Sequence, residues 1–428
     1  MKNYLPRIID NEIEENLEVM GAINIRGPKW CGKTTTAEHF SKSIFKVQGD
    51  AYEGKTDNNK ILAEENPYLA LKGEKPRTID EWQLVPELWN AIRNSVDDIG
   101  KPGQYILTGS ATPEEKKTED LHSGAGRFAF INMKPMTLFE SNDSNGTISL
   151  KDLFNHNDDI DGKKSDITFE KMAYLIARGG WPQSLQVSEK GALIIPKNYI
   201  EAVVNSDISK IDGVSRNPDL ARAILRAYAR HVSTIDSDNS IIADAVANFG
   251  EASRVTITDY ITQLKKLFLI DEIPAWNPNI RSKTAIRSTN KKSFVDPSIA
   301  VAALSVTPEE IIYDMNTFGL LFENLVDRDL SVYIESIEGS LNHYRDRYGL
   351  EADQILKLNN GKYALVETKL GATYIPEAEE HLLNLERLIE ENEPRLGKPE
   401  FLMIVTCTNT AYTTKNGVKV VPIGCLKN

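Results

Sequence analysis

The sequence has little cysteine and no long apolar run. Cys31, Cys407 and Cys425 are the only cysteines among 428 residues, and they provide neither a disulfide framework nor the spacing of a metal site. The longest apolar runs, such as 401–405, fall far short of the roughly 20 residues needed to cross a bilayer. The first residues contain no apolar stretch typical of a signal peptide. We therefore expect a protein of the reducing cytoplasm with no membrane partner.

Positive charge is also not in excess, because the formal net charge is −12. Affinity for nucleic acid depends largely on neutralising phosphates, so this charge disfavours wholesale coating of DNA or RNA. It does not exclude a local basic surface. Hydrophobic residues make up 41% and charged residues 26% of the chain, as is typical of a globular protein.

The length predicts two to four domains, and three changes in composition suggest their boundaries. The stretch 141–165 is rich in Asp, Asn and Gly and reads as a linker. Gly179-Gly180-Trp181-Pro182 marks a helix stop, and the pattern changes again near 296–308. The predicted domains are 1–145, 166–300 and 309–428.

The first domain alternates strands and helices and contains the pattern of a phosphate-binding loop. An expected strand at 21–26 leads into Gly27-Pro28-Lys29-Trp30-Cys31-Gly32-Lys33-Thr34, and an expected helix follows at 35–46. This strand, loop and helix is the context that the pattern requires. The glycines let backbone N–H groups point at phosphate oxygens, Lys33 reaches the β- and γ-phosphates, and the Thr34 hydroxyl binds Mg²⁺. The residues predicted to bind ATP are Gly27, Pro28, Lys29, Trp30, Cys31, Gly32, Lys33, Thr34 and Thr35.

Two acidic residues end the next short strand, Arg77-Thr78-Ile79-Asp80-Glu81. Asp80 is placed to hold Mg²⁺ together with Thr34, and Glu81 to act as the general base for an attacking water. Hydrolysis of ATP is therefore expected as well as binding.

Two further positions are candidates for the catalytic site. A third strand, 103–110, ends in small hydroxyl residues, and Ser110 or Thr108 could place a polar group between the γ-phosphate and the water. Arg127 precedes the last strand, 128–132, and is a candidate for stabilising the transferred phosphoryl group of a neighbouring subunit. A solvent-facing arginine and an ordinary strand end explain the same residues.

These motifs together resemble an AAA-plus ATPase family, common in bacteria and archaea, that pairs an N-terminal ATPase with a C-terminal domain of unknown function. The resemblance rests on the P-loop and on these further segments: Tyr4-Leu5-Pro6-Arg7, Ile79-Asp80-Glu81-Trp82-Gln83-Leu84-Val85-Pro86, Leu107-Thr108-Gly109-Ser110, Gly126-Arg127, Pro135-Met136-Thr137-Leu138-Phe139-Glu140 and Gly179-Gly180-Trp181-Pro182. It extends over most of the chain. It implies an α/β fold with a parallel sheet, and a C-terminal domain similar to the PD-(D/E)xK nucleases.

The middle of the chain is expected to be helical. Residues 220–231 form an amphipathic pattern typical of a core helix, and 253–267 resemble the second helix of a winged helix-turn-helix. The segment 279–292 carries Arg281, Lys283, Arg287, Lys291 and Lys292 with no acidic residue. Such a wing suits a phosphate backbone, although a solvated hairpin or a protein-docking lid explains it equally.

The C-terminal domain contains a second set of polar residues. An expected helix at 318–329 bears Glu323, a strand at 350–356 bears Asp353, and a strand at 362–369 ends in Glu367 and Lys369. Strand alternation places Glu367 and Lys369 on one face. Two carboxylates could hold a second divalent metal there while Lys369 orients a water. This order of residues resembles the PD-(D/E)xK nucleases, although Ala352 departs from their usual pattern and acidic residues outnumber basic ones in this domain.

Two classes of function stay open. In the first, turnover of ATP with Mg²⁺ drives or licenses action on DNA or RNA by the C-terminal domain. In the second, the protein is an ATP-dependent molecular switch, and an inactive nuclease-like domain binds a protein partner. A homo-oligomer is expected if Arg127 acts between subunits.

Overall fold

The computed structural model describes residues 4–48, 58–111, 124–157, 159–250, 252–276, 289–345 and 351–428. Within these ranges, no helix has both the length and the apolar character needed to cross a membrane. The chain divides into two compact units, and each contains its own sheet. The first unit comprises Met1–Pro135, Ser206–Arg216 and Gln263–Phe268, and the second comprises Met136–Asn205, Asn217–Thr262 and Leu269–Asn428.

The sheet of the first unit has five parallel strands in the order β2-β3-β4-β1-β5. Ile23 of the central strand lies between Ile106 and Ala129 of its neighbours. The parallel arrangement confirms the expected α/β class, and all the loops that follow the strands start at one edge. The strands are β1 (Ala22–Arg26), β2 (Ser43–Lys46), β3 (Arg77–Asp80), β4 (Tyr105–Gly109) and β5 (Phe128–Asn132).

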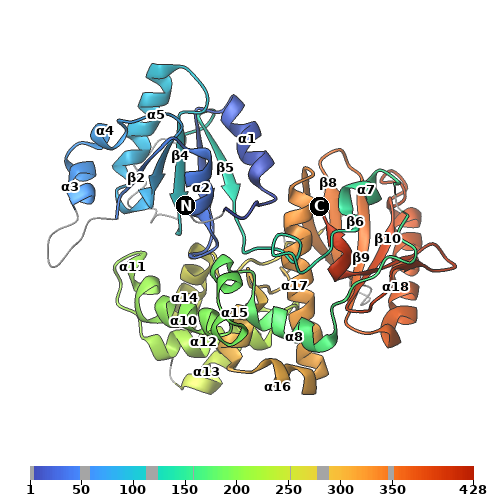
Figure 1. Cartoon of the computed structure of the whole chain (residues 1–428). Helices are drawn as coiled ribbons and strands as arrows, with labels where there is room; N and C mark the ends of the chain where they lie inside the picture. The colour runs from blue at the N-terminus through green and yellow to red at the C-terminus, as the bar shows by residue number, and fades with distance from the viewer. Residues whose placement is uncertain are drawn as a thin grey trace. The chain divides into compact units, whose positions relative to one another are not determined.

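Helices cover both faces of this sheet (Figure 1). Ile23 and Ile106 pack with α1 (Asp10–Val19) and α2 (Lys33–Phe40) on one face. Tyr105 and Leu107 pack with α5 (Glu87–Ile99) on the other. Consecutive strand residues enter opposite cores because strand side chains alternate. Two shorter helices, α3 (Asn58–Glu65) and α4 (Pro67–Ala70), complete the α5 side.

The expected helix at 35–46 is wrong in its second half. Helix α2 ends at Phe40, Ser41 is extended, and Ser43–Lys46 form the edge strand β2. The Lys42 amide donates to the Pro76 carbonyl at 2.8 Å, immediately before β2 pairs with β3. A partner strand more than 30 residues away in sequence therefore overrides the local helical pattern.

The sheet of the second unit has six strands in the order β11-β12-β10-β9-β8-β7. Helix α18 (Ile375–Asn392) packs on one face, where Leu382 and Leu385 join Leu365 and Ile404 in a buried cluster. Helix α17 (Met315–Glu335) packs against β7, β8 and β9. The strands are β7 (Gly339–Arg345), β8 (Glu351–Leu358), β9 (Tyr363–Lys369), β10 (Leu402–Thr406), β11 (Tyr412–Thr413) and β12 (Lys419–Pro422).

The remainder of the second unit is mainly helical. Its helices are α8 (Phe169–Arg178), α9 (Glu189–Ala192), α10 (Ile194–Ala202), α12 (Pro218–Arg230), α13 (Asp238–Phe249), α15 (Pro297–Leu304), α16 (Pro308–Tyr313) and the part of α14 (Arg254–Lys266) before Gln263. Helix α12 confirms the amphipathic prediction, because Leu220, Ile224 and Tyr228 are buried on one side. After α14, Ile270 pairs with Phe294 and Ile273 pairs with Lys291 in antiparallel bridges. A winged helix remains a prediction.

The predicted linker at 141–165 contains regular structure instead. It includes β6 (Ile148–Ser149) and α7 (Leu150–Phe154), and β6 pairs in parallel with β13 (Leu426–Lys427). The Ser144 hydroxyl donates to the Leu426 carbonyl at 2.6 Å, and the Ser149 hydroxyl donates to the Asn428 carbonyl at 2.8 Å. The partners come from the far end of the sequence, so local composition could not indicate them.

A buried ion cluster connects α17 to two of the quoted motifs. The Arg328 guanidinium lies 2.9 Å from a carboxylate oxygen of Asp296 and 2.7 Å from one of Asp329. Asp296 also accepts the Gly180 amide, and Asp329 accepts the Leu138 amide, each at 2.9 Å. The Thr137–Phe139 and Gly179–Trp181 segments are therefore held by side chains at least 116 positions away.

Candidate functional sites

The loop between β1 and α2 is shaped by two glycines with positive φ angles. Gly27 has φ 155° and Gly32 has φ 107°. A Cβ atom on Gly27 would lie 2.1 Å from the Met133 carbonyl oxygen, so a side chain cannot fit there. The Lys33 ammonium donates to the carbonyl oxygens of Gly27 at 2.9 Å and Pro28 at 2.7 Å. The loop thus curls around its lysine.

Arg7 fixes this loop from the outside. Its guanidinium donates to the Cys31 carbonyl and to the Lys134 carbonyl, both at 2.8 Å, and the residue is almost fully buried. One side chain therefore connects the loop to the segment after β5. This contact gives a physical reason for arginine in the Tyr4-Leu5-Pro6-Arg7 motif.

The structure brings Thr34, Asp80 and Thr108 together beside the loop. The Thr34 hydroxyl donates to one Asp80 carboxylate oxygen at 2.8 Å, and the Thr108 hydroxyl donates to the same oxygen at 2.5 Å. Asp80 is largely buried at the end of β3. One hydroxyl and one carboxylate, with phosphate oxygens and waters completing the shell, are what Mg²⁺ normally uses in nucleotide sites. The residues present therefore fit this ion.

Glu81 is held in an unusual backbone conformation next to Asp80. Its φ of 59° and ψ of 42° are left-handed, which costs energy for a residue with a Cβ atom and often marks a functional position. Its carboxylate accepts the Ser110 hydroxyl at 2.9 Å and also the side-chain amide of Gln83. The predicted Ser110 is thus in contact with the predicted base. Sequence reasoning missed Gln83, which lies in the quoted motif but was given no role.

Lys29 of the loop has a partner that the sequence did not indicate. Its ammonium lies 2.7 Å from the Asp207 carboxylate, which is 8% exposed. Asp207 ends a stretch of π-helix, 203–207, and π-helical turns are frequent at functional sites. No signal in the local sequence connects positions that are 178 residues apart.

Arg127 lies away from the loop. It immediately precedes β5, whereas the phosphate-binding loop follows β1, and the two strands are parallel. Arg127 is therefore at the opposite edge of the sheet, where its guanidinium pairs with Asp97 at 2.9 Å. Action on a nucleotide of a second subunit stays a prediction, and it would require this partly exposed ion pair to break.

In the second unit, the predicted C-terminal residues come together. The Lys369 ammonium lies 2.6 Å from a Glu367 carboxylate oxygen and 3.5 Å from one of Asp353. Asp353 also accepts the Thr368 amide at 2.8 Å. Glu323 reaches this group from α17 through another residue, Lys291, whose ammonium donates to the Glu323 carboxylate and to the Asp353 backbone carbonyl.

The expectation that Lys291 and Lys292 contact a phosphate backbone is wrong. Both residues are buried, with 3% and 2% of their surface exposed. Lys291 pairs with Glu323 at 2.8 Å and Asp327 at 2.9 Å, and Lys292 pairs with Asp238 and Glu272. Buried ammonium groups require such partners. Arg281, Lys283 and Arg287 lie outside the described residues.

Burial and charge set the protonation of this cluster. Burial raises the pKa of Glu323 to about 8 even though the Lys291 charge opposes the shift. Burial and the neighbouring Asp353 raise the pKa of Glu367 well above its usual value. The charges of Lys369 and Lys291 outweigh burial at Asp353 and lower its pKa. Glu367 therefore carries a proton more readily than Asp353. Protonation of Glu367 lowers the total negative charge of the cluster.

A metal is not required to explain this cluster. Within the described ranges, no group of three or more His, Cys, Asp or Glu side chains is placed to hold a metal ion. The second divalent metal therefore stays a prediction. No role was predicted for Asp327 or for Gln354, whose side-chain amide donates to Asp327 at 2.8 Å, and Lys291 was predicted to lie in a wing rather than in this cluster.

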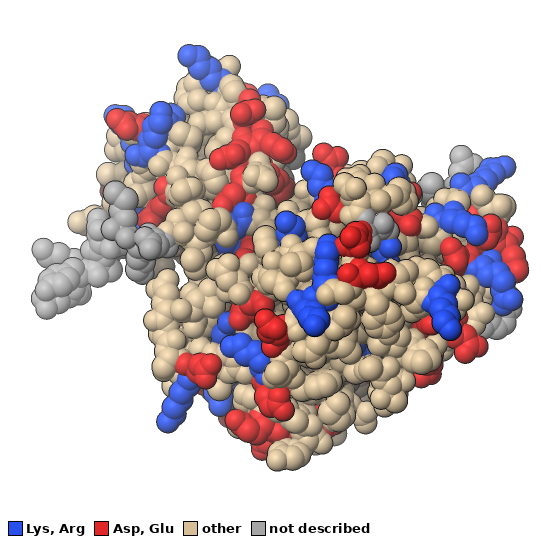
Figure 2. Space-filling view, turned by 45° about the vertical axis from the view of Figure 1, so that its right-hand side comes forward, with Lys and Arg blue, Asp and Glu red and all other residues tan. Residues whose placement is uncertain are grey.

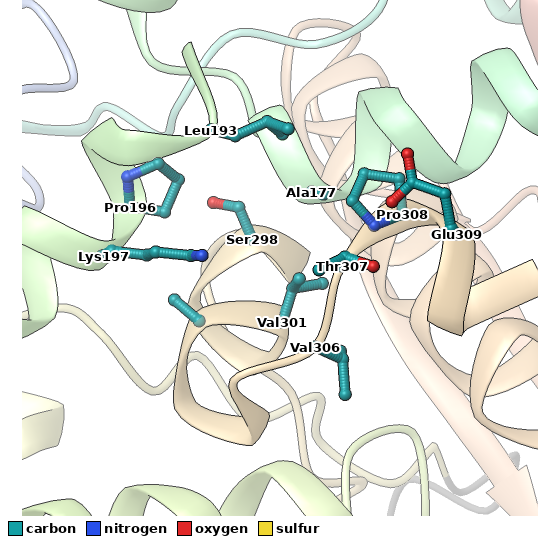
Figure 3. A pocket seen from close by; sticks show the side chains of 11 residues that line it. Ala177, Leu193, Pro196, Lys197, Ser298, Val301, Val306, Thr307, Pro308 and Glu309 are labelled. Atoms are coloured by element: carbon teal, nitrogen blue, oxygen red, sulfur yellow. The ribbon is translucent and has the colours of Figure 1, made fainter. Parts of the chain in front are cut away.

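Figure 2 shows one face of the molecule with its charged residues in colour. Figure 2 shows lysines and arginines interspersed with acidic residues on the face it presents, without a continuous basic patch among the described residues. The second unit also contains a cavity of about 130 Å³ between α8, α10, α15 and the start of α16 (Figure 3). Its lining includes Ala177, Leu193 and Val301 and none of the predicted site residues.

A parallel sheet with a glycine loop closed around Lys33, beside Thr34 and Asp80, defines a P-loop nucleotide-binding domain. The comparisons agree, because residues 20–142 match the family described as AAA domain. This match supports an AAA-type ATPase. Residues 169–310 and 318–426 each match a family described as a domain of unknown function, DUF8612 and DUF4143 respectively.

Several whole proteins are also similar to this chain in sequence or in structure. Over 341 residues the chain is 22% identical to uncharacterized proteins of Mycobacterium tuberculosis and Mycobacterium bovis, covering 79% of this chain and 68% of each relative. A Walker-type ATPase of Pyrococcus abyssi aligns at 14% identity over 69% of this chain and 94% of its own, with a TM-score of 0.41. A signal-transduction ATPase with numerous domains from Pyrococcus horikoshii aligns at 13% identity over 92% of this chain and 53% of its own, with a TM-score of 0.26.

Proposed function

We propose that this protein binds ATP with Mg²⁺ and hydrolyses it at the site formed by the loop after β1. The observation that carries the proposal is the convergence of the Thr34 and Thr108 hydroxyls on one oxygen of Asp80, next to the loop that encloses Lys33. Three separate elements supply the two hydroxyls and the carboxylate, and an ordinary glycine turn that binds no ligand would not require them to converge.

Each residue then has a defined task. The loop amides and Lys33 bind the phosphates, and Thr34 and Asp80 would hold Mg²⁺, which neutralises charge on the β- and γ-phosphates. Glu81 takes a proton from the attacking water, and Ser110 and Gln83 keep its carboxylate oriented. Pre-set hydrogen bonds of this kind avoid the cost of arranging the base during each turnover.

Two variants test this assignment. Lys33→Ala removes the ammonium that faces the phosphates and should sharply weaken ATP binding, measured by fluorescence with a labelled ATP analogue. Glu81→Gln keeps the shape and loses the base, so binding should persist while phosphate release falls by roughly 10²- to 10⁴-fold. Asp98→Ala, at an exposed position of α5, is the control and should hydrolyse ATP at the parental rate. Parental hydrolysis by Glu81→Gln would show that Glu81 is not the base.

For the second unit we propose a PD-(D/E)xK-like domain that binds a partner in response to ATP and does not cut nucleic acid. The specific observation in favour is that the Lys291 ammonium contacts Glu323, one of the predicted nuclease-site residues, together with the neighbouring Asp327. Active cleavage of DNA or RNA is the alternative. Incubation of the protein with ATP, Mg²⁺ or Mn²⁺ and labelled DNA and RNA should give phosphate release without strand scission. Scission that disappears in Asp353→Asn would instead establish the nuclease.

A further inference from the structure

Three oxygen atoms surround the Lys291 ammonium. They are a Glu323 carboxylate oxygen at 2.8 Å, an Asp327 carboxylate oxygen at 2.9 Å and the Asp353 backbone carbonyl oxygen at 2.9 Å. They come from α17 and β8, and two of the three oxygens belong to Glu323 and Asp353, which were predicted for the nuclease-like site. Carboxylate and carbonyl oxygens are the ligands that hard divalent cations prefer. The ammonium is therefore bound by the kind of oxygen shell that a metal ion would take.

The lysine is firmly seated. Its side chain is 4% exposed, and that of Asp327 is 2% exposed. The carboxylates of Asp327 and Glu323 outweigh burial and raise the pKa of Lys291, so the amine stays charged. The Lys291 backbone is also fixed, because it exchanges two hydrogen bonds with Ile273 at 2.9 and 3.0 Å. The ammonium is thus presented by an anchored segment.

The cluster nevertheless retains acceptor capacity. The second carboxylate oxygen of Asp327 is buried and has no hydrogen-bond partner among the residues that the structure describes. Two cations, Lys291 and Lys369, face four carboxyl groups in this region. Buried acceptors without partners are costly, so a cation of higher charge would be accepted if the space held by the ammonium were available.

We infer that the Lys291 ammonium is the resident cation of the cluster formed by Glu323, Asp327, Asp353 and Glu367, and that it excludes divalent metal ions from this position. This inference does not depend on ATP hydrolysis. It concerns the second unit alone, so failure of the proposed ATPase activity would leave it intact.

The test is metal-dependent melting of the full chain without nucleotide, with Mn²⁺ as the probe. The parent protein should gain no stability from millimolar Mn²⁺ through this cluster. Lys291→Met should melt lower than the parent because the carboxylates lose their counter-ion, and Mn²⁺ should raise its melting temperature by several degrees, since a ligand that binds only the folded state stabilises it. Adding Glu323→Gln to Lys291→Met should abolish that gain.

Lys292→Met is the matched control. Lys292 is the next residue, is equally buried, and pairs with Asp238 and Glu272 outside the cluster. This variant should lose stability but show no rescue by Mn²⁺. A gain in the parent as large as in Lys291→Met would overturn the inference, and so would an unresponsive Lys291→Met. If Lys291→Met does not fold, Lys291→Gln takes its place in the same experiment. Electron paramagnetic resonance gives a second test: a bound-Mn²⁺ signal in the parent that disappears in Asp327→Asn would also overturn the inference.

Discussion

Replacing Arg328 with methionine should destabilise the second unit strongly. The guanidinium is 1% exposed and contacts Asp296 and Asp329, which are fully buried. Methionine has a similar length but no charge, so the variant leaves two carboxylates without a counter-ion. Each retains a backbone N–H donor, from Gly180 and Leu138 respectively, and these bonds offset part of the loss. Breaking a buried pair typically costs about 3–5 kcal/mol.

The matched control is Arg222→Met in the same unit. Arg222 also contacts two carboxylates, Glu201 at 2.7 Å and Asp219 at 2.9 Å, but its side chain is 38% exposed. Solvent screens such pairs, so we expect a cost of about 1 kcal/mol or less. Comparison of the two variants separates the effect of burial from the effect of removing an arginine.

The assay is thermal and urea unfolding followed by circular dichroism. For a unit of this size, the expected loss in Arg328→Met corresponds to a fall in melting temperature of roughly 6 to 20 °C. The near-ultraviolet signal should change as well, because Trp181 donates to Ser298 at 2.9 Å beside Asp296. Equal melting temperatures for Arg328→Met and Arg222→Met would refute the claim that the buried cluster stabilises this unit.

Two further predictions concern pH and assembly. Burial and the Lys291 charge lower the pKa of His343 from 6.5 to about 4. Between these pH values the unfolded chain binds more protons than the folded chain. The free energy of unfolding should therefore fall by up to about 3 kcal/mol as the pH drops from 6.5 to 4. His343→Gln should flatten this part of the stability profile in urea titrations, and an unchanged profile would contradict the assignment. If Arg127 acts between subunits, Arg127→Ala should lower turnover by about 10³-fold or more, and mixing it with Glu81→Gln protein should restore part of the phosphate release. If light scattering shows a monomer and the ATPase assay shows that this monomer is fully active, Arg127 does not act between subunits.

The geometry of the candidate nucleotide site was largely predictable because its signals are local. Strands β1, β3, β4 and β5 lie where the apolar runs placed them, and the glycine pattern between β1 and α2 specifies a loop conformation by itself. The candidates Ser110 and Thr108 follow from strand order, since parallel strands deliver their carboxyl ends to one edge. The contact of Gln83 with Glu81 was not predicted, because it depends on the left-handed turn at Glu81, which the sequence does not specify.

The C-terminal cluster was predictable only in part. Helix and strand patterns placed Glu323, Asp353, Glu367 and Lys369 correctly within their elements. Lys369 contacts Asp353 and Glu367, and Glu323 joins them through Lys291. Lys291 was misread because a run of basic residues normally indicates a solvated surface. Its carboxylate partners lie 32 and 36 positions away, and only the tertiary fold brings them to it.

The pairing of β6 with β13 sets an order of events during synthesis. Ser144 bonds to Leu426 across 282 positions, and at a translation rate of 5–20 residues per second these partners emerge roughly 15 to 60 s apart. Throughout that interval the 144–149 segment has been made but its partner strand has not. The first unit can bury the core of its five-stranded sheet much earlier, because those strands lie within Ala22–Asn132. A nascent chain would therefore acquire its nucleotide-binding sheet well before the sheet pairing of its second unit is complete, and a chain that stalled in between would expose an unpaired strand edge to chaperones and proteases.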